Sequence, residues 1–217
     1  MDFDALLTML ACTADPARAA PMRAYMKNRF DFLGIAKPQL MRVCKPFFKG
    51  AAQADVDWRF VKQCWAAPHR ELQYCALEYL RAVQSKLTPQ DIPQLQQLIT
   101  TKSWWDTADF LDRIVGGIAL RYPDVNAVLL AWSQSENIWL RRVAIDHQLL
   151  RKEKTDTALL EQILRNNLGQ TEFFINKAMG WALRDYSKTH PDWVRRFIAD
   201  YRQGMSRLSL REAQKYL

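Results

Sequence analysis

The residues best suited to chemistry are two tryptophans and three aspartates in the stretch TKSWWDTADFLDRIVGG, which begins at residue 101. Trp105 precedes Asp109 by four residues, so the two side chains share one face of a helix. A preorganised carboxylate can stabilise positive charge that develops in a transition state, and the electron-rich face of an indole ring also favours cations. The spacing alone leaves Trp105 equally open to a place in the core or in a site.

A second group of residues combines an aromatic ring with cations. Trp181 follows Lys177 by four residues and precedes Arg184 by three, which places all three on one helix face. A ring between cations is a reasonable nucleic-acid surface, because bases stack on rings and phosphates pair with cations. The net charge of +8 and the pI of about 9.4 agree with an anionic partner. Charge is weak evidence alone, because many basic proteins bind nothing acidic.

Both groups lie in a repeat of about 35 residues. The aligned segments are PQLMRVCK from residue 38, RELQYCAL from 70, SWWDTADF from 103, IWLRRVAI from 138 and FFINKAMG from 173. Their third residues are 32, 33, 35 and 35 positions apart. This period in a helix-favouring composition indicates stacked helix pairs, and the Gly and Tyr pattern of TPR repeats is missing. We therefore predict an all-α fold, a right-handed α-solenoid of HEAT-like helix pairs with a concave basic groove.

We expect a single domain over residues 1–217, with N-terminal helices over about 1–50 and repeats over about 51–217. Three segments look like helix starts with proline in the first turn: Thr88–Asp91, Tyr122–Asp124 and His190–Asp192. Ser209 and Glu212 have the spacing of a capping box, and Ser103 and Asp106 could form a similar pair. Asp112 is expected to be solvated.

The repeat gives an expectation for each position. The third position is apolar in every copy: Leu40, Leu72, Trp105, Leu140 and Ile175. The seventh position is occupied by Cys44, Ala76, Asp109, Ala144 and Met179. A carboxylate where the other copies have small or apolar residues costs free energy unless a partner compensates it. Because such departures tend to mark functional sites, Asp109 is the leading candidate for one.

The fifth position is mostly polar, and its residues are Arg42, Tyr74, Thr107, Arg142 and Lys177. A row of this kind could contact phosphates along a groove. The alternative is that the fifth position simply faces solvent, as lysine and arginine usually do.

The remaining tryptophans are expected to be structural. Trp104, Trp139 and Phe174 share one position of the repeat, so core packing is the better interpretation for all three. Packing is also expected for Trp58, Trp65, Trp132 and Trp193.

The cysteines argue against a metal site. The chain has four cysteines without a C-x-x-C pair and only three histidines, so zinc is not expected and the thiols are interpreted as reduced, as in a cytosolic protein. The sequence MDFDALLTML has no basic region before its apolar residues, so we do not expect a signal peptide. No apolar run approaches the roughly 20 residues that span a membrane.

Five motifs follow one another over nearly the whole chain. They are YMKN at 25–28, FLGI at 32–35, TKSWWD at 101–106 followed by Asp109, NIWL-x-R at 137–142, and FF-I-x-KA-x-GW-x-LR at 173–184. In this combination the chain resembles the AlkD-type DNA alkylation repair glycosylases, a family of HEAT-like solenoids that remove cationic alkylated purines. The combination is far more specific than any single short motif.

The resemblance implies roles for individual residues. Asp109 matches the catalytic aspartate of the family. Trp105 and Trp181 match the two tryptophans that line the cleft against the lesion nucleotide. Arg142 matches an arginine that holds the DNA backbone nearby.

Other positions are implied to lie near DNA. Arg184 and Tyr25 fall at such family positions, and Lys177 shares the face of Trp181. Ala36 follows FLGI where the family pattern has a longer polar side chain, which puts a contact to the opposite strand in doubt.

The implied reaction is hydrolysis of the N-glycosidic bond of N3-methyladenine or N7-methylguanine in duplex DNA, without base flipping. A purine alkylated at N3 or N7 is cationic and already a good leaving group, so one carboxylate suffices where sugar-bond hydrolysis usually uses two. We expect a monofunctional glycosylase with no cofactor or metal, acting as a monomer in the cytoplasm and associated with the nucleoid when bound to DNA.

Two alternatives remain at this point. A non-catalytic HEAT-like DNA-binding or scaffold protein fits the charge and the solenoid equally well. A protein–protein adaptor would use the same groove for acidic peptides. Asp109 and the paired tryptophans fit the non-catalytic protein less well. The retention of Asp109, both tryptophans and Arg142 argues for an active glycosylase.

Overall fold

The computed structural model describes all 217 residues, which form helices and an isolated bridge between Asp31 and His69 but no strand. The predicted all-helical class is therefore confirmed. The chain divides into two compact units, Met1–Leu87 and Thr88–Leu217, which are described separately. The expectation of a single domain stays a prediction. A bilayer crossing would need a longer and more apolar helix than any in this chain.

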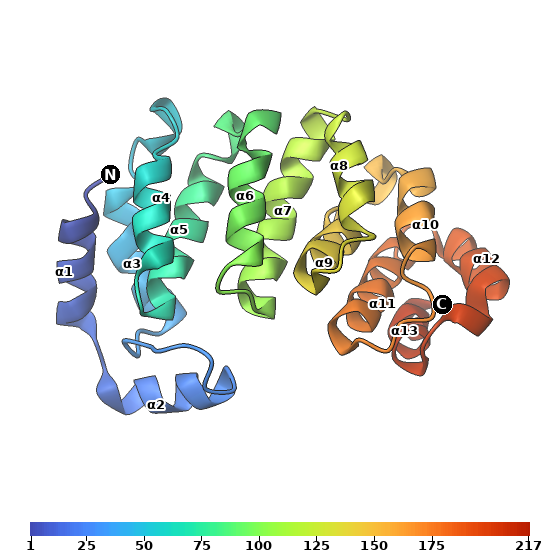
Figure 1. Cartoon of the computed structure of the whole chain (residues 1–217), viewed down its shortest axis with the longest axis horizontal. Coiled ribbons are helices and arrows are strands. Elements are labelled where there is room, and N and C mark those ends of the chain that lie inside the picture. The colour runs from blue at the N-terminus through green and yellow to red at the C-terminus, as the bar shows by residue number, and fades with distance from the viewer. The chain divides into compact units, whose positions relative to one another are not determined.

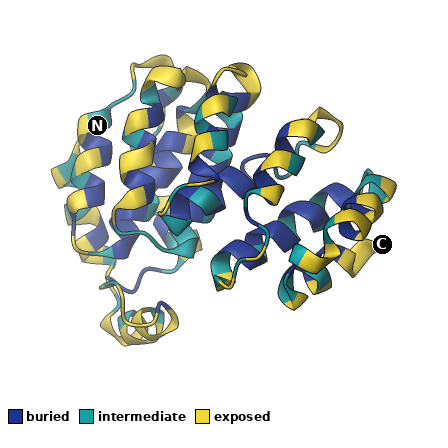
Figure 2. Ribbon diagram, turned by 45° about the vertical axis from the view of Figure 1, so that its right-hand side comes forward, coloured by how far each residue is buried: buried dark blue, intermediate teal, exposed yellow.

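The first unit holds five α-helices: α1 (Phe3–Thr13), α2 (Pro16–Tyr25), α3 (Lys37–Phe47), α4 (Trp58–Ala66) and α5 (Arg70–Ala82). Helices α1, α3, α4 and α5 pack against one another (Figure 1). Helix α2 is capped by Asp15, whose carboxylate accepts from the Ala17 and Arg18 amides, and its first residue is Pro16. It contains no buried residue, and Figure 2 shows it largely exposed.

The FLGI segment has a structural explanation in this unit. The carboxylate of Glu71, which is fully buried, accepts hydrogen bonds from the amides of Leu33, Gly34 and Ile35 at 3.0, 2.9 and 3.1 Å. Gly34 has a φ of +85°, and a Cβ there would lie 2.0 Å from the carbonyl oxygen of Asp15. Only glycine fits this turn, which fixes the start of α2 against the segment that leads into α3.

The second unit holds the other eight α-helices: α6 (Ile92–Thr100), α7 (Trp105–Arg121), α8 (Val125–Trp132), α9 (Ile138–Asp146), α10 (Thr157–Arg165), α11 (Phe173–Ser187), α12 (Pro191–Tyr201) and α13 (Arg207–Ala213). Helix α7 packs against α9, α9 against α11, and α11 against α13. Helices α6, α8, α10 and α12 pack against the helices of this row (Figure 1). The repeating helix pairs are confirmed, while the handedness and the concave basic groove stay predictions.

All five aligned sequence segments fall on the helices of the packed row and its counterpart in the first unit, namely α3, α5, α7, α9 and α11. A sixth copy was missed. It is LSLREAQK from residue 208 on α13, and its third residue, Leu210, follows Ile175 by 35 positions. The spacing was the signal that could have found this copy.

Two of the three predicted helix starts are confirmed, and the third is wrong because α8 begins at Val125, after Pro123. Thr88 and Asp91 form a reciprocal capping box, and Pro191 is the first residue of α12. The Ser209–Glu212 capping box is wrong, because α13 begins earlier and its cap is Ser206.

The Ser103–Asp106 cap is also wrong. Helix α7 begins at Trp105 without a side-chain cap, and the Ser103 hydroxyl donates to the carbonyl of Ile99 at 2.7 Å.

The aromatic residues before and in the first turns of α7, α9 and α11 form one cluster. The ring centroids of Trp104, Trp139 and Phe174 lie 5.7, 5.2 and 5.0 Å apart. The predicted packing of these three residues is confirmed. The cluster fixes the N-terminal ends of three successive repeats, from which the candidate site residues project.

Candidate active site

The centre of the candidate site is a bidentate ion pair between Asp109 on α7 and Arg142 on α9. The Nε of Arg142 donates to Oδ1 of Asp109 at 2.6 Å, and its Nη2 donates to Oδ2 at 2.9 Å. The remaining terminal nitrogen, Nη1, donates to the backbone carbonyl of Phe174 at 2.7 Å. The guanidinium therefore ties three successive helices of the row, α7, α9 and α11, to one another.

The two partners differ in exposure. The Asp109 side chain is 23% exposed, whereas the Arg142 side chain is 2% exposed. Burial opposes the charged form of Arg142, but Asp146 and the hydrogen bonds to Asp109 outweigh it and raise the pKa of Arg142. The arrangement presents a carboxylate at the surface with a permanently charged cation fixed behind it.

The repeat explains why this pair forms. Helix α9 lies between α7 and α11 in the row, and the fifth position of α9 faces the seventh position of α7. The other seventh-position residues Cys44, Ala76, Ala144 and Met179 are buried, as expected. Asp109 is the exception and has the compensating partner that its position requires.

The predicted row of exposed fifth positions is wrong for two of its members. Thr107 and Arg142 are both buried, with 2% exposure. The donors of Arg142 are used by Asp109 on α7 and by the Phe174 carbonyl on α11. The geometry favours a role of Arg142 in holding Asp109 over the predicted contact with a DNA phosphate, which stays a prediction.

Trp181 on α11 lies among three cations. Its ring centroid is 5.1 Å from the Arg142 guanidinium, 5.8 Å from the Lys177 ammonium and 5.9 Å from the Arg184 guanidinium. The ring is partly exposed. The predicted face of Lys177, Trp181 and Arg184 is thus formed, and through Arg142 it adjoins Asp109.

Glu212 on α13 organises this face and was missed by sequence reasoning. Its carboxylate accepts from Lys177 and Arg184 at 2.7 Å each and from Lys215 at 3.0 Å. The hydrogen bond from Lys177 is the main reason that the pKa of Glu212 is lowered to about 2. Gly180 lets α13 approach, because a Cβ there would lie 2.5 Å from the Cβ of Glu212.

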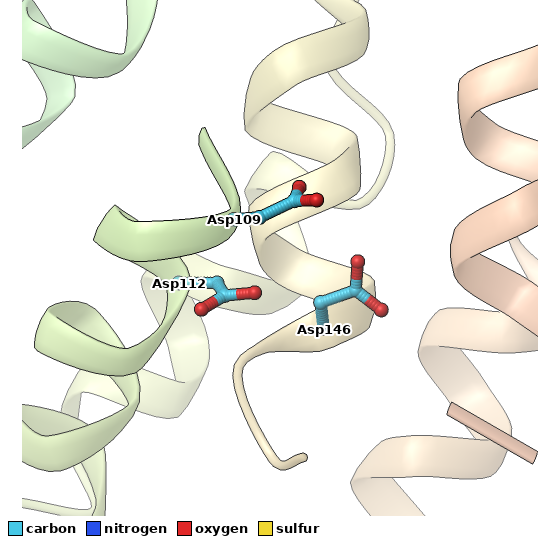
Figure 3. A group of neighbouring side chains, drawn as sticks. All are labelled: Asp109, Asp112 and Asp146. Carbon is cyan, nitrogen blue, oxygen red and sulfur yellow. The ribbon is translucent and has the colours of Figure 1, made fainter. Parts of the chain in front are cut away.

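Two further carboxylates lie beneath Asp109. Asp112 on α7 and Asp146 on α9 are 2% and 1% exposed, so the expectation that Asp112 is solvated is wrong. Figure 3 shows the three aspartates converging between the two helices. Burial, followed by the charge of Asp146, raises the pKa of Asp112 well above its usual range. Burial is also the main cause that raises the pKa of Asp146 to about 7.

One carboxylate oxygen from each of the three aspartates lies within 4.8 Å of the others, a spacing that could suit a metal ion. Both oxygens of Asp109 are, however, bonded to Arg142. The guanidinium therefore supplies the positive charge that a metal would otherwise bring to this cluster.

The other predicted residues are placed as follows. Trp105 is the first residue of α7, one turn before Asp109, and is partly exposed. Tyr25 is the last residue of α2 in the first unit and is 69% exposed. Ala36 precedes α3 and provides no side-chain cap. The roles predicted for Trp105 and Tyr25 stay predictions.

Of the three clustered aspartates, Asp109 is the accessible one. Asp109 can stabilise a neighbouring cation or orient a water molecule, while Asp112 and Asp146 are buried and cannot reach a substrate. Glycosidases that protonate their leaving group need two accessible carboxylates. The geometry thus suits a reaction in which the leaving group departs without a strong general acid.

Known proteins resemble this chain in sequence and fold. A family model described as DNA alkylation repair enzyme matches residues 6–217. A structure described as a predicted DNA alkylation repair enzyme from Enterococcus faecalis is 32% identical, with a TM-score of 0.87 over 94% of this chain and 96% of that one. No curated protein matches the chain.

Two more distant structures share the fold. AlkD2 from Streptococcus mutans is 16% identical, with a TM-score of 0.61 over 83% of this chain and 98% of that one. The protein smu.31 from Streptococcus mutans UA159 is 15% identical, with a TM-score of 0.61 over 82% and 97% of the two chains. The family match extends over almost all of the sequence, and the repeat architecture agrees with it. The chain therefore belongs to the family of DNA alkylation repair enzymes.

Proposed function

We propose that this protein is a monofunctional DNA glycosylase that hydrolyses the N-glycosidic bond of cationic alkylated purines, such as N3-methyladenine and N7-methylguanine, in duplex DNA. The observation that carries the proposal is the single accessible carboxylate of Asp109, held in a fixed orientation by a buried arginine. Membership of a DNA alkylation repair family supports it.

The chemistry follows from the charge of the lesion. Alkylation at N3 or N7 makes the purine cationic, so the C1′–N9 bond breaks with its electron pair moving to the base, which leaves as a neutral molecule. The deoxyribose gains oxocarbenium character, and Asp109 stabilises this positive charge electrostatically. A water oxygen then bonds to C1′ and gives up a proton, for which the same carboxylate is the nearest acceptor.

The remaining residues bind and position the DNA in this proposal. Trp105 and Trp181 hold the deoxyribose of the lesion nucleotide, and their ring faces favour its developing positive charge. Lys177 and Arg184 contact backbone phosphates, and Tyr25 contributes from α2. Because no deep pocket is required, the base need not be flipped out of the duplex, unlike in most glycosylases. The protein acts as a monomer without a cofactor, in the cytoplasm and on the nucleoid.

The decisive experiment measures release of N3-methyladenine and N7-methylguanine from methylated duplex DNA under single-turnover conditions. Wild type should release both, and Asp109→Asn should lose at least a hundredfold in rate. Asp106→Asn, a matched change in the first turn of the same helix, should retain the wild-type rate. If wild type binds DNA and releases no base, the protein is a non-catalytic DNA-binding member of the family. If Asp109→Asn keeps the full rate, the catalytic assignment is wrong.

The substrate range provides a second test. Selectivity in this mechanism comes from the charge and lability of the lesion itself, so uracil and hypoxanthine should be poor substrates. Efficient release of either neutral base would contradict the mechanism.

A further inference from the structure

Asp146 is a buried carboxyl group without a hydrogen-bond donor. Both of its carboxylate oxygens are inaccessible to solvent and lack a hydrogen-bond partner. Buried polar atoms in proteins are nearly always paired, so an orphaned carboxylate needs an explanation. Its nearest cationic atom is Nη2 of Arg142, 3.9 Å from Oδ2, beyond hydrogen-bonding distance. The same Nη2 donates to Asp109.

The charged groups that face Asp146 come from three helices. Its own helix contributes Arg142, α7 contributes the two aspartates 109 and 112 together with Arg113, and α11 contributes Asp185. Helices α6 and α8, which also pack against α9, contain no charged residue. The charged residues of α10, Glu161 and Arg165, are turned toward Tyr201. Anionic groups thus outnumber the cations around Asp146, and Arg142 is the cation that both Asp109 and Asp146 can use.

We propose that Asp146 is a positioning residue that competes with Asp109 for the guanidinium of Arg142 and so sets the charge that Asp109 presents to the substrate. When Asp146 is protonated, Arg142 pairs with Asp109 alone and neutralises much of the negative charge of Asp109. When Asp146 is ionised, Nη2 is drawn toward it and Asp109 is left more anionic. The inference rests on the proposed function only for its effect on rate.

Protonation of Asp146 gives this competition a pH dependence. Burial raises the pKa of Asp146 to about 7, while the nearby Arg142 lowers it. Near neutral pH the carboxyl group therefore changes its charge. Ionisation of Asp146 adds negative charge behind the site and weakens the pairing of Asp109 with Arg142. Both effects stabilise the oxocarbenium-like transition state. The excision rate should rise with pH through this range.

The experiment compares single-turnover excision of N7-methylguanine between pH 5.5 and 9 at saturating enzyme. Wild type should accelerate about tenfold as the pH rises through about 7, where Asp146 ionises. Asp146→Asn, which is fixed in the uncharged state and nearly isosteric, should be slow and independent of pH, close to the wild-type rate at low pH. Asp146→Glu should restore the rise with a shifted midpoint. Asp192→Asn, a change at an 82% exposed carboxylate, should keep the wild-type profile.

A measurement on the free protein separates this proposal from the proposed function. The Nε–H resonance of Arg142, recorded by ¹⁵N NMR, should titrate with the same midpoint near pH 7 in wild type and not in Asp146→Asn. If wild type excises nothing but this titration is present, the glycosylase assignment fails and the competition for Arg142 stands. If excision occurs while both the rate and the Arg142 resonance are independent of pH in wild type, or if Asp146→Asn keeps the wild-type profile, the positioning role is overturned.

Discussion

Replacing Arg142 with alanine distinguishes two roles for this residue. If it holds Asp109, the change removes two charge-assisted hydrogen bonds, of 2.6 and 2.9 Å, and a third bond to the Phe174 carbonyl. It also leaves the buried carboxyl group of Asp146 without its main cation, and loss of one partner of a buried ion pair typically costs 3 to 5 kcal/mol. We expect the free energy of unfolding to fall by about 4 kcal/mol. Such a loss is a large part of the 5 to 15 kcal/mol that stabilises a typical domain.

A double-mutant cycle isolates the pair. The free energies of unfolding of wild type, Arg142→Ala, Asp109→Ala and the double variant, measured in urea, give the coupling energy. Two hydrogen bonds to a charged group contribute roughly 1.5 kcal/mol each at the lower end. We therefore expect about 2 to 3 kcal/mol, reduced by the 23% exposure of Asp109. A coupling below about 0.5 kcal/mol, the size found for exposed pairs, would refute the structural role.

DNA binding gives the complementary readout for Arg142. A phosphate contact would make Arg142→Ala lower the slope of log Kd against log salt by about one unit. A residue that acts through Asp109 should leave that slope unchanged and lower the excision rate instead. Lys177→Ala provides the comparison, because its partly exposed ammonium group is the better candidate for a phosphate contact. A loss of slope in the Arg142 variant equal to that in the Lys177 variant would restore the phosphate role.

Three further predictions concern stability and accessibility. Gly180→Ala should lower the free energy of unfolding by roughly 1 to 3 kcal/mol, because its Cβ would meet the Cβ of Glu212 at 2.5 Å, and urea unfolding measures this loss. Glu212 has a folded pKa of about 2, below its ordinary value of 4.5, so it stabilises the fold above pH 4.5 and loses this effect as the pH falls toward 2. The Tm of Glu212→Gln should accordingly lie below that of wild type at pH 6 and converge with it near pH 2, and an equal difference at both pH values would contradict the pairing. Of the four thiols, only Cys12 is exposed, so Ellman's reagent should titrate one thiol in the native protein and four after unfolding; rapid native reaction of more than one would show that the buried cysteines are accessible.

The repeat and the central carboxylate could be predicted from the sequence. Helix packing imposes its period on apolar residues, so the segments on α5, α7, α9 and α11 align and reveal Asp109 as an exception. The pattern also identified the packing of Trp104 and the shared face of Lys177 and Trp181. These features depend on spacing within one helix, which the sequence states directly.

The partners of those residues could not be predicted in the same way. The burial of Arg142, the orphaned Asp146 and the contacts of Glu212 all depend on which helix lies beside which, and at what distance. A basic residue at a polar position looks the same in sequence whether it faces water or a neighbouring repeat. Asp112 was misjudged for this reason, since its neighbour Arg113 is 41% exposed while Asp112 itself lies in the helix interface.

The bidentate pair of Asp109 and Arg142 lies where repeats meet, because its members and the Phe174 carbonyl come from three consecutive copies of the repeat. No single copy, however well folded, contains the arrangement. A duplication that merely lengthened the array would add scaffold without adding a second reactive centre, unless an aspartate and an arginine arose together in adjacent copies. Truncation experiments should therefore find that activity requires α7, α9 and α11 together, and that loss of any one of these three helices abolishes it.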